Sequence, residues 1–305
     1  MAIRKYGMSV FVAAGMIFGQ DSVSLAGHTR DVNVVACSSD GKMIASGAED
    51  EKTFLWDTAA HQEIASVAGG GAVMSVSISP DGKRIASGER YHKVNLLDPA
   101  GKVVKVLEGH DAAVIATGFT ADSKTLMTFS LDGGMRLWDA ATGAPQGATK
   151  TPLDSYTAGA FSADGRWFAG GTSQSLYLYN VAIKKAGIKM QPGIMVRAVA
   201  FSPDGKTVAA ALNDQTVRLY STADGKEMGS IAGVEANGLA YSPDGTKIAA
   251  AGHDNDVKLI DAAGRLVVTT LKGHGRTVRS VCFLPGGRSV VSGSFDMTVR
   301  IWPLR

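Results

Sequence analysis

Three histidines lie at fixed distances from a hydroxyl, a carboxylate and a tryptophan, and such a set of side chains can carry out hydrolytic chemistry. Each histidine precedes a Ser or Thr by 18 residues, an Asp by 22 and a Trp by 28. In a hydrolase the imidazole accepts the proton of the hydroxyl while the carboxylate orients the ring. The set recurs three times, whereas a nucleophile must reach one substrate, so we expect a structural role and no catalysis. The sets are His28, Ser46, Asp50 and Trp56; His110, Thr128, Asp132 and Trp138; and His274, Ser292, Asp296 and Trp302.

Two further segments contain residue types that bind ions or phosphate. His253, Asp254 and Asp256 lie together in a polar stretch that could surround a metal ion, and the glycines at 69–71 could approach a phosphate. The first stretch is typical of a hairpin tip before a strand. The glycines do not join a strand to a helix, so a spacer is the better interpretation. The sequence therefore predicts no metal site and no cofactor.

The spacing of the tryptophans belongs to a repeat that covers nearly the whole chain. A large apolar residue followed by a polar residue or Pro recurs seven times at intervals of 40 to 42 residues. Turn sequences related to Ser-Pro-Asp-Gly recur in phase with it. A period of this length predicts a propeller or another repeat array. The seven pairs are Trp56-Asp57, Leu97-Asp98, Trp138-Asp139, Tyr179-Asn180, Tyr220-Ser221, Ile260-Asp261 and Trp302-Pro303.

Each period contains the elements of one four-stranded sheet. Pro presets φ at the first turn position and Gly accepts a positive φ, so Ser79-Pro80-Asp81-Gly82 and its counterparts predict hairpins. Runs rich in Val, Ala, Thr and Tyr, as at 196–202, 207–211 and 216–220, predict three strands, and a fourth follows, as at 103–107. Seven such sheets arranged radially cover one another's faces. The sequence therefore predicts an all-β fold, a single seven-bladed β-propeller of four-stranded antiparallel sheets over residues 20–305.

Gly-His dipeptides that precede a Trp by a constant distance resemble the repeats of the WD40 family. The dipeptides are Gly27-His28, Gly109-His110 and Gly273-His274. The resemblance implies a seven-bladed propeller in which each His, Ser or Thr, Asp and Trp set forms a buried hydrogen-bonded tetrad. The second and fourth repeats have Tyr91 and Ser173 at the Asp position, and the fifth and sixth keep Asp214 and Asp254 without the His or the Trp. We expect these four blades to rely more on apolar packing and to be locally less stable.

The N-terminus is expected to close the ring and to carry an export signal. The last repeat ends at Arg305 directly after its third strand, and residues 21–26 match the fourth strands of other repeats. Arg4 and Lys5 precede an uncharged apolar stretch at 7–18, which is too short to span a bilayer and has the form of a signal peptide. We expect a signal peptide over residues 1–19, with cleavage that spares the closing strand, and a periplasmic or secreted protein. The alternative is a cytoplasmic protein in which this segment is a strand.

Two cysteines, Cys37 and Cys282, fall on the innermost strands of the first and seventh repeats, which a closed ring makes neighbours. They are one position apart in the aligned repeat, so we expect their side chains to point to opposite sheet faces. The sequence therefore predicts two buried free thiols.

The charge balance argues against nucleic acid as a partner. The chain has 31 Lys and Arg against 28 Asp and Glu, a net charge of +3, and its basic residues are scattered. No pair of acidic residues has the spacing typical of a glycosidase. We expect no nucleic-acid partner and no stable membrane span.

The resemblance also implies that partners contact the face that carries the Gly-His loops and the loops before each tetrad Asp. Aligned repeats place apolar side chains and arginines at exposed positions of this face, a combination that suits a protein interface. The predicted partner-binding residues are Asp31, Asn33, Glu49, Met74, Arg90, Ile115, Leu131, Met195, Arg197, Asn237, His253, Arg279 and Phe295. We therefore favour a non-catalytic scaffold for an unknown protein or peptide. The alternatives are a propeller hydrolase or lyase, or a sensor of a small ligand, acting outside the cytoplasm.

Overall fold

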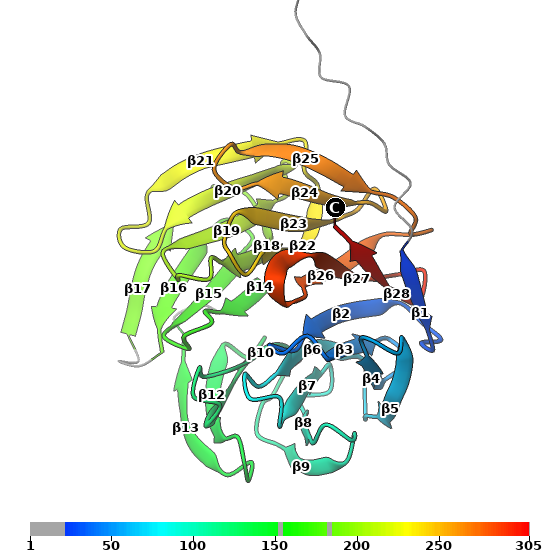
Figure 1. The fold of residues 1–305 in the computed structure, drawn as a ribbon. Coiled ribbons are helices and arrows are strands. Elements are labelled where there is room, and N and C mark those ends of the chain that lie inside the picture. The colour runs from blue at the N-terminus through cyan, green and yellow to red at the C-terminus, as the bar shows by residue number, and fades with distance from the viewer. Residues whose placement is uncertain (1–21, 152–154, 182–184, 305) are drawn as a thin grey trace, which may run out of the picture.

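The computed structural model describes residues 22–151, 155–181 and 185–304. Its strands form seven four-stranded antiparallel sheets, which follow one another around a central axis as the blades of a propeller (Figure 1). The predicted all-β, seven-bladed fold is confirmed. The predicted signal peptide at 1–19 lies outside the described residues.

Six blades are built from four consecutive strands, numbered from the axis outward. Blade 1 is β2 (Val32–Cys37), β3 (Met43–Ala48), β4 (Lys52–Asp57) and β5 (Gln62–Ala68); blade 2 is β6 (Val73–Ile78), β7 (Ile85–Glu89), β8 (Val94–Leu97) and β9 (Val103–Leu107); blade 3 is β10 (Val114–Phe119), β11 (Thr125–Ser130), β12 (Gly134–Asp139) and β13 (Pro145–Lys150). Blade 4 is β14 (Tyr156–Phe161), β15 (Trp167–Thr172), β16 (Leu176–Asn180) and β17 (Lys185–Met190); blade 5 is β18 (Val196–Phe201), β19 (Thr207–Leu212), β20 (Thr216–Ser221) and β21 (Glu227–Ala232); blade 6 is β22 (Ala236–Tyr241), β23 (Lys247–Gly252), β24 (Val257–Asp261) and β25 (Leu266–Leu271).

The seventh blade joins the two ends of the described chain. It contains β26 (Val278–Phe283), β27 (Ser289–Ser294) and β28 (Thr298–Pro303), with the 3-10 turn η1 (Pro285–Gly287) between the first two. Its outermost strand is β1 (Val23–Ala26), which pairs antiparallel with β28. The expected closing strand is therefore confirmed, and its Leu25 is buried in the neighbouring apolar cluster.

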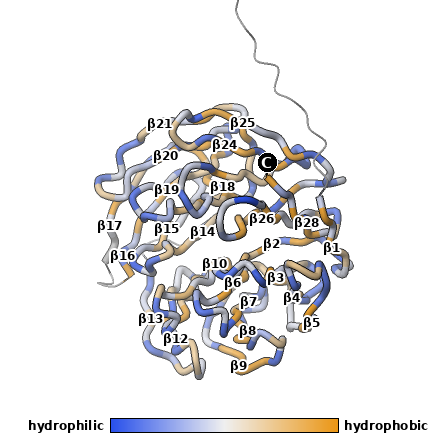
Figure 2. Tube along the Cα trace, viewed as in Figure 1, coloured by the Kyte–Doolittle hydropathy of each residue, from blue (hydrophilic) through white to orange (hydrophobic). Residues whose placement is uncertain are grey.

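The core lies between the blades. Seven apolar clusters each combine residues of two neighbouring blades, including blades 7 and 1. Figure 2 shows apolar residues along the strands and hydrophilic residues in the turns. Blades approach closely at glycines: a Cβ at Gly47 would lie 2.2 Å from Val73 of the next blade, and one at Gly293 would lie 2.7 Å from Val32. Each blade is therefore stabilised mainly by the two blades beside it.

A disulfide joins Cys37 on β2 to Cys282 on β26, with their Cα atoms 6.0 Å apart. The prediction of two free thiols is wrong. The two side chains do point to opposite faces of the aligned repeat, but in a ring one face of each blade meets the opposite face of the next. Side chains on opposite faces of blades 7 and 1 therefore meet in the space between those blades, where both cysteines pack against the same apolar cluster.

Candidate functional site

The three predicted tetrads contain continuous hydrogen-bonded chains. In blade 1 the Nδ1 of His28 donates to Asp50 at 2.9 Å, the Ser46 hydroxyl donates to Nε2 at 2.8 Å, and the Nε1 of Trp56 donates to that hydroxyl at 2.8 Å. The directions follow because a carboxylate only accepts and an indole only donates. Blades 3 and 7 have the same bonds at 2.7 to 3.1 Å.

The tetrad geometry does not suit hydrolysis. The hydroxyls of Ser46, Thr128 and Ser292 are fully buried, and each already accepts one hydrogen bond from the Trp and donates one to the His. A nucleophile must reach its substrate, which these side chains cannot do without opening a blade. The tetrads satisfy buried polar groups and fix the loop at one end of the blade to its second and third strands.

Acidification is expected to weaken the tetrads. Burial lowers the pKa of His28 and of His110 below the ordinary value of 6.5. Burial alone would raise the pKa of Asp296, but hydrogen bonds, led by that from His274, lower it below 3.8. The stability that the neutral histidines contribute is present above pH 6.5 and is lost as the pH falls through their lower folded-state pKa. The contribution of Asp296 is present above pH 3.8 and is lost below it. The melting temperature should therefore be level from pH 8 to 6.5 and should fall progressively at lower pH.

Circular dichroism melts at half-unit pH steps measure this dependence. In His28→Gln the fall between pH 6.5 and 5 should become shallower, because one buried titrating ring is gone. His61→Gln is the matched control, since His61 is exposed. If both variants followed the parent curve, the buried histidine would not be the source of the pH dependence.

Two blades without a full tetrad use ion pairs in its place. Asp214 of blade 5 accepts a hydrogen bond from Arg218 at 2.8 Å, and Asp254 of blade 6 accepts one from Lys258. In each case the cation lies four residues after the Asp, on the third strand of the blade. These blades therefore have polar contacts that the expectation of apolar packing did not include.

The two segments considered for ion or phosphate binding have internal partners. The Gly70 amide donates to the Glu89 carboxylate at 3.1 Å, so this loop faces an anion of the protein itself. Glu89 also accepts a 2.6 Å bond from Asn95, and burial raises its pKa. In the described part of the chain no three His, Cys, Asp or Glu side chains lie close enough together to hold a metal ion.

Seven side chains form a ring around the central channel. Each is the second residue of the innermost strand of its blade, near the N-terminal end of that strand. In every blade the pairing of this strand with the next shifts register at that residue. A bulge of this kind redirects the side chain, here into the channel. The ring consists of Asn33, Met74, Ile115, Thr157, Arg197, Asn237 and Arg279, and all seven line one cavity of about 320 Å³.

The ring has a polar and an apolar side. Arg197, Asn237 and Arg279 come from the three consecutive blades 5, 6 and 7. Met74 and Ile115 come from blades 2 and 3. Leu131, 39% exposed, lines the cavity on the apolar side. The cavity therefore presents cationic and apolar groups to one ligand.

A rim surrounds the ring and is fixed to it through the backbone. In six blades the amide of the residue before the tetrad Asp position donates to the residue two positions before the ring residue, as Leu131 does to Ala113 at 2.9 Å. The six donors are Glu49, Arg90, Leu131, Asn213, His253 and Phe295. These bonds fix the backbone of the rim to the segments that lead into the innermost strands.

Side-chain contacts link neighbouring blades along the rim. Arg90 donates to Glu49 at 2.6 Å, and Asn33 donates to the same carboxylate at 3.0 Å. Between blades 7 and 1, Arg276 donates to Asp31 at 3.1 Å. Several predicted face residues therefore contact one another and hold the entrance in shape.

The predicted face divides into two groups. Asn33, Met74, Ile115, Leu131, Arg197, Asn237 and Arg279 line the cavity. Asp31, Glu49, Arg90, Met195, His253 and Phe295 do not line it. Sequence reasoning missed Arg276 in the rim and Tyr156 in the cavity wall. Tyr156 could have been found from the repeat, because the other blades have Val or Ala at that position.

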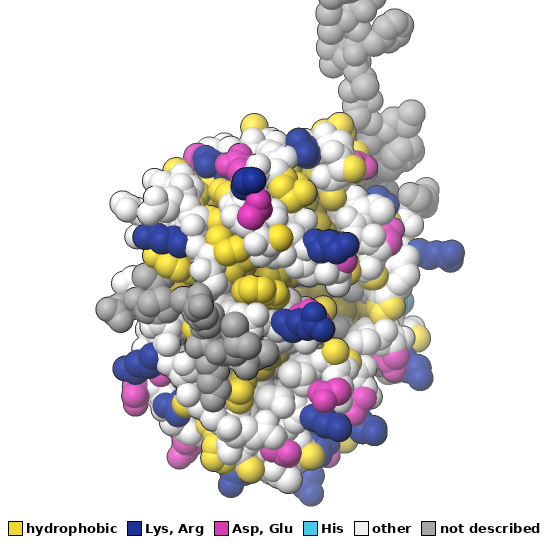
Figure 3. Space-filling model, turned by 90° about the vertical axis from the view of Figure 1, so that its left-hand side faces the viewer, with side chains coloured by type: hydrophobic (Ala, Val, Ile, Leu, Met, Phe, Trp, Pro, Cys, Tyr) yellow, Lys and Arg dark blue, Asp and Glu magenta, His cyan; other side chains and the backbone are white. Residues whose placement is uncertain are grey.

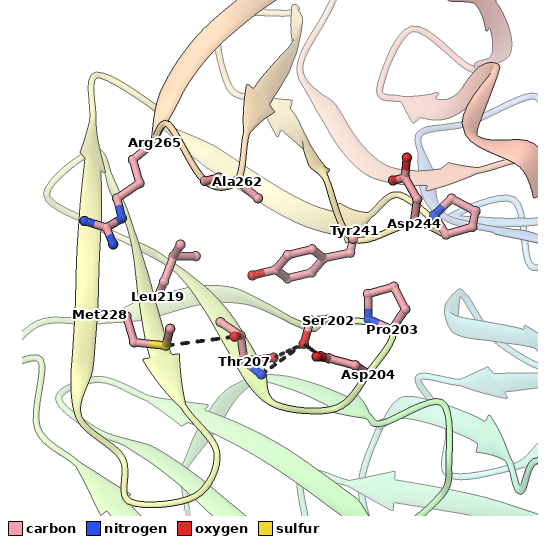
Figure 4. Close-up of a pocket in the computed structure, with 13 residues that line it drawn as sticks. Ser202, Pro203, Asp204, Thr207, Leu219, Met228, Tyr241, Asp244, Ala262 and Arg265 are labelled. Carbon is pink, nitrogen blue, oxygen red and sulfur yellow. Dashed lines mark hydrogen bonds between the residues drawn. The ribbon is translucent and has the colours of Figure 1, made fainter.

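A larger cavity of about 660 Å³ lies at the opposite end of the blades, between blades 5 and 6. Figure 4 shows Tyr241 extending between the blades, with Leu219 and Met228 on one side. Burial raises the pKa of Tyr241. The Asp204 carboxylate already accepts a 2.6 Å bond from Ser202 within its turn. Residues of two blades line this cavity, whereas all seven blades contribute to the channel.

Charges of both signs are interspersed on the side of the molecule in Figure 3, and apolar surface is visible between them. This side has no broad area of positive charge, which is the usual mark of a nucleic-acid site. No helix in the described ranges is long and apolar enough to cross a membrane.

The family of the chain follows from its repeats. The model of the WD domain, G-beta repeat matches residues 19–57, 62–98, 101–139, 191–221, 229–261 and 265–303, more than half of the sequence. The chain belongs to the WD40 family. The fourth blade is the one that these matches leave out, in agreement with its Ser173 at the tetrad Asp position. WD40 propellers are usually non-catalytic and typically bind proteins.

Several relatives are similar to the chain over part of their length. The nuclear distribution protein nudF of Emericella nidulans is 28% identical over 66% of this chain and 42% of its own. An uncharacterized WD repeat-containing protein of Synechocystis, sll1491, is 29% identical over 42% of this chain and 38% of its own. Periodic tryptophan protein 2 of Arabidopsis thaliana is 26% identical over 90% of this chain and 22% of its own. The chain thus spans less than half of each of these three relatives.

Proposed function

We propose that this WD40 propeller is a non-catalytic scaffold and that the channel ring and its rim bind a protein or peptide partner. The observation that carries the proposal is the cavity to which all seven blades contribute a side chain. Its mixture of apolar residues and arginines has the composition of a binding hot spot. A peptide segment entering the channel would contact several blades at once.

Substitutions of the ring residue Ile115 and of the rim residue Phe295 test this proposal. Ile115→Asp and Phe295→Ala should each reduce the recovery of co-purifying partners at least tenfold, because a charge or a gap replaces an apolar contact. Val268→Asp is the matched control, since Val268 is 46% exposed on the outermost strand β25. Quantitative affinity purification measures recovery, and unchanged melting temperatures show that the variants are folded. Partners that bind all three variants equally well would contradict the choice of this face.

We also propose that the protein is exported. The basic residues and short apolar stretch at 4–18 have the form of a signal peptide, and the Cys37–Cys282 disulfide is of the kind that persists in oxidising compartments. Fractionation of an expressing Gram-negative host and mass spectrometry of the mature N-terminus test this. A periplasmic product that begins near Gln20 is expected, and an uncleaved cytoplasmic product would refute export.

A further inference from the structure

The Arg279 guanidinium lies in the central channel. It lines the central cavity, and within the described ranges this side chain has no hydrogen bond and no ion pair. Burial lowers its pKa, and the positive charge of Arg197 lowers it further. A half-buried cation without an anion is costly to a fold, because the charge has lost part of its hydration. A ligand that brings an anion would remove this cost.

The second arginine of the cavity, Arg197, is already engaged, and so are Arg90 and Arg276 beside the cavity. Arg197 donates to Asn213 at 2.8 Å and to Asn237 at 3.3 Å, and the Glu235 carboxylate lies 4.0 Å from it. Arg276 and Arg90 each donate to a carboxylate of the rim. Of the two arginines that line the cavity, Arg279 is therefore the one whose donors have no partner among the described residues, and Arg197 adds positive potential beside it.

The opposite side of the cavity limits the ligand further. Met74, Ile115 and Leu131 offer apolar surface across the channel from the arginines. A volume of about 320 Å³ is near the lower limit of ligand sites, roughly 300 to 1,000 Å³, so it suits one or two side chains. A single free guanidinium matches the single charge of a carboxylate, and its planar donors match the two oxygens.

We propose that Arg279 binds a carboxylate of an acidic peptide segment in the partner, while an adjacent apolar side chain of that segment packs against Met74, Ile115 and Leu131. This inference rests on the proposed function and names the chemistry of its ligand. Asp or Glu side chains and a C-terminal carboxylate share this chemistry.

Selection of a random heptapeptide library on the purified full chain tests the proposal. The selected peptides should be enriched in an acidic residue beside Leu, Ile, Met or Phe. Isothermal titration calorimetry with synthetic copies then separates the sources of the carboxylate. If a side-chain carboxylate of the peptide binds, replacing its Asp or Glu by Asn or Gln should weaken binding about tenfold or more. If the C-terminal carboxylate of the peptide binds, amidating the C-terminus should have this effect.

Variants of the protein identify the receiving group. Arg279→Gln should lose about tenfold or more of the affinity for the acidic peptide, and Arg279→Lys should retain part of it, because the charge remains without the planar donors. Arg265→Gln is the control, since Arg265 is exposed and lines the cavity at the other end of the blades (Figure 4). The melting temperature of Arg279→Gln should equal or exceed that of the parent, because an uncompensated charge is removed.

The outcomes distinguish this inference from the proposed function. The carboxylate site is wrong if the selected peptides lack acidic residues or bind Arg279→Gln as tightly as the parent. If Ile115→Asp abolishes binding of those same peptides, the peptide-binding face stands. If no peptide is selected, or if binding is insensitive to Ile115→Asp as well, both proposals fail.

Discussion

Replacing Cys37 and Cys282 together by alanine should lower the free energy of unfolding by about 5 kcal/mol. The two residues are 245 positions apart, and their bond joins the innermost strands of blades 1 and 7. A cross-link that closes so long a segment restricts the unfolded chain strongly, and its contribution grows with the logarithm of the segment length. Without the bond the ring remains closed through the pairing of β1 with β28 and the apolar cluster between these blades.

Urea unfolding followed by tryptophan fluorescence measures this effect. The reduced parent protein is the matched control, because it keeps both sulfur atoms and loses only the bond. The reduced parent and the double variant should unfold at similar, lower urea concentrations, with the variant slightly lower because two side chains are truncated. A midpoint that reductant leaves unchanged while the thiols become titratable would show that the noncovalent closure alone sets the stability.

The fold was predictable because one pattern is repeated seven times. A single turn such as Ser202-Pro203-Asp204-Gly205 predicts only a hairpin, but seven related turns in phase with Trp138, Trp302 and their counterparts define a closed set of sheets. The closing strand was predictable by counting, because the last repeat lacks the strand that residues 23–26 supply. Errors in one repeat are corrected by the others, which is why the weak fourth blade did not obscure the architecture.

The candidate site was predictable in position but not in shape. Alignment of the repeats placed Asn33, Arg197 and Arg279 at equivalent positions, and the structure brings them to one cavity. The bulge that turns these side chains into the channel depends on the pairing of two strands, and no single residue type marks it. Whether an arginine of this ring has a partner depends on residues of neighbouring blades, which the order of the sequence does not reveal.

The disulfide was mispredicted for a geometric reason. The expectation of free thiols treats Cys37 and Cys282 as members of one sheet, where adjacent positions point apart. They belong to two sheets that face each other, so adjacent positions in the repeat converge. The ion pairs of Asp214 with Arg218 and of Asp254 with Lys258 were missed because they replace a tetrad with different residue types. Contacts that depart from the repeat are therefore the ones that repeat analysis cannot supply.

Trp302→Ala should destabilise the protein by about 3 to 5 kcal/mol. Trp302 is fully buried and packs with Val278, Phe283 and Val290 in the cluster between blades 6 and 7. Its Nε1 donates a 2.7 Å hydrogen bond to the Ser292 hydroxyl. Truncation to alanine therefore leaves a cavity and also leaves this buried hydroxyl without the hydrogen bond that it accepts. The expected loss of stability therefore has three sources: the apolar surface that is no longer buried, the cavity that remains, and the missing hydrogen bond of the tetrad.

Trp302→Phe separates these terms. Phenylalanine keeps much of the apolar contact and lacks the N–H, so its cost should be smaller, about 1 to 2 kcal/mol. Chemical unfolding of both variants and the parent, followed by circular dichroism, measures the difference. If the two variants were equally destabilised, the hydrogen bond to Ser292 would dominate and the tetrad would be the main stabilising feature of the blade. If only the alanine variant were destabilised, packing between blades would dominate. Blades with Leu, Tyr or Ile at this position would then lose little, because those side chains also fill the space.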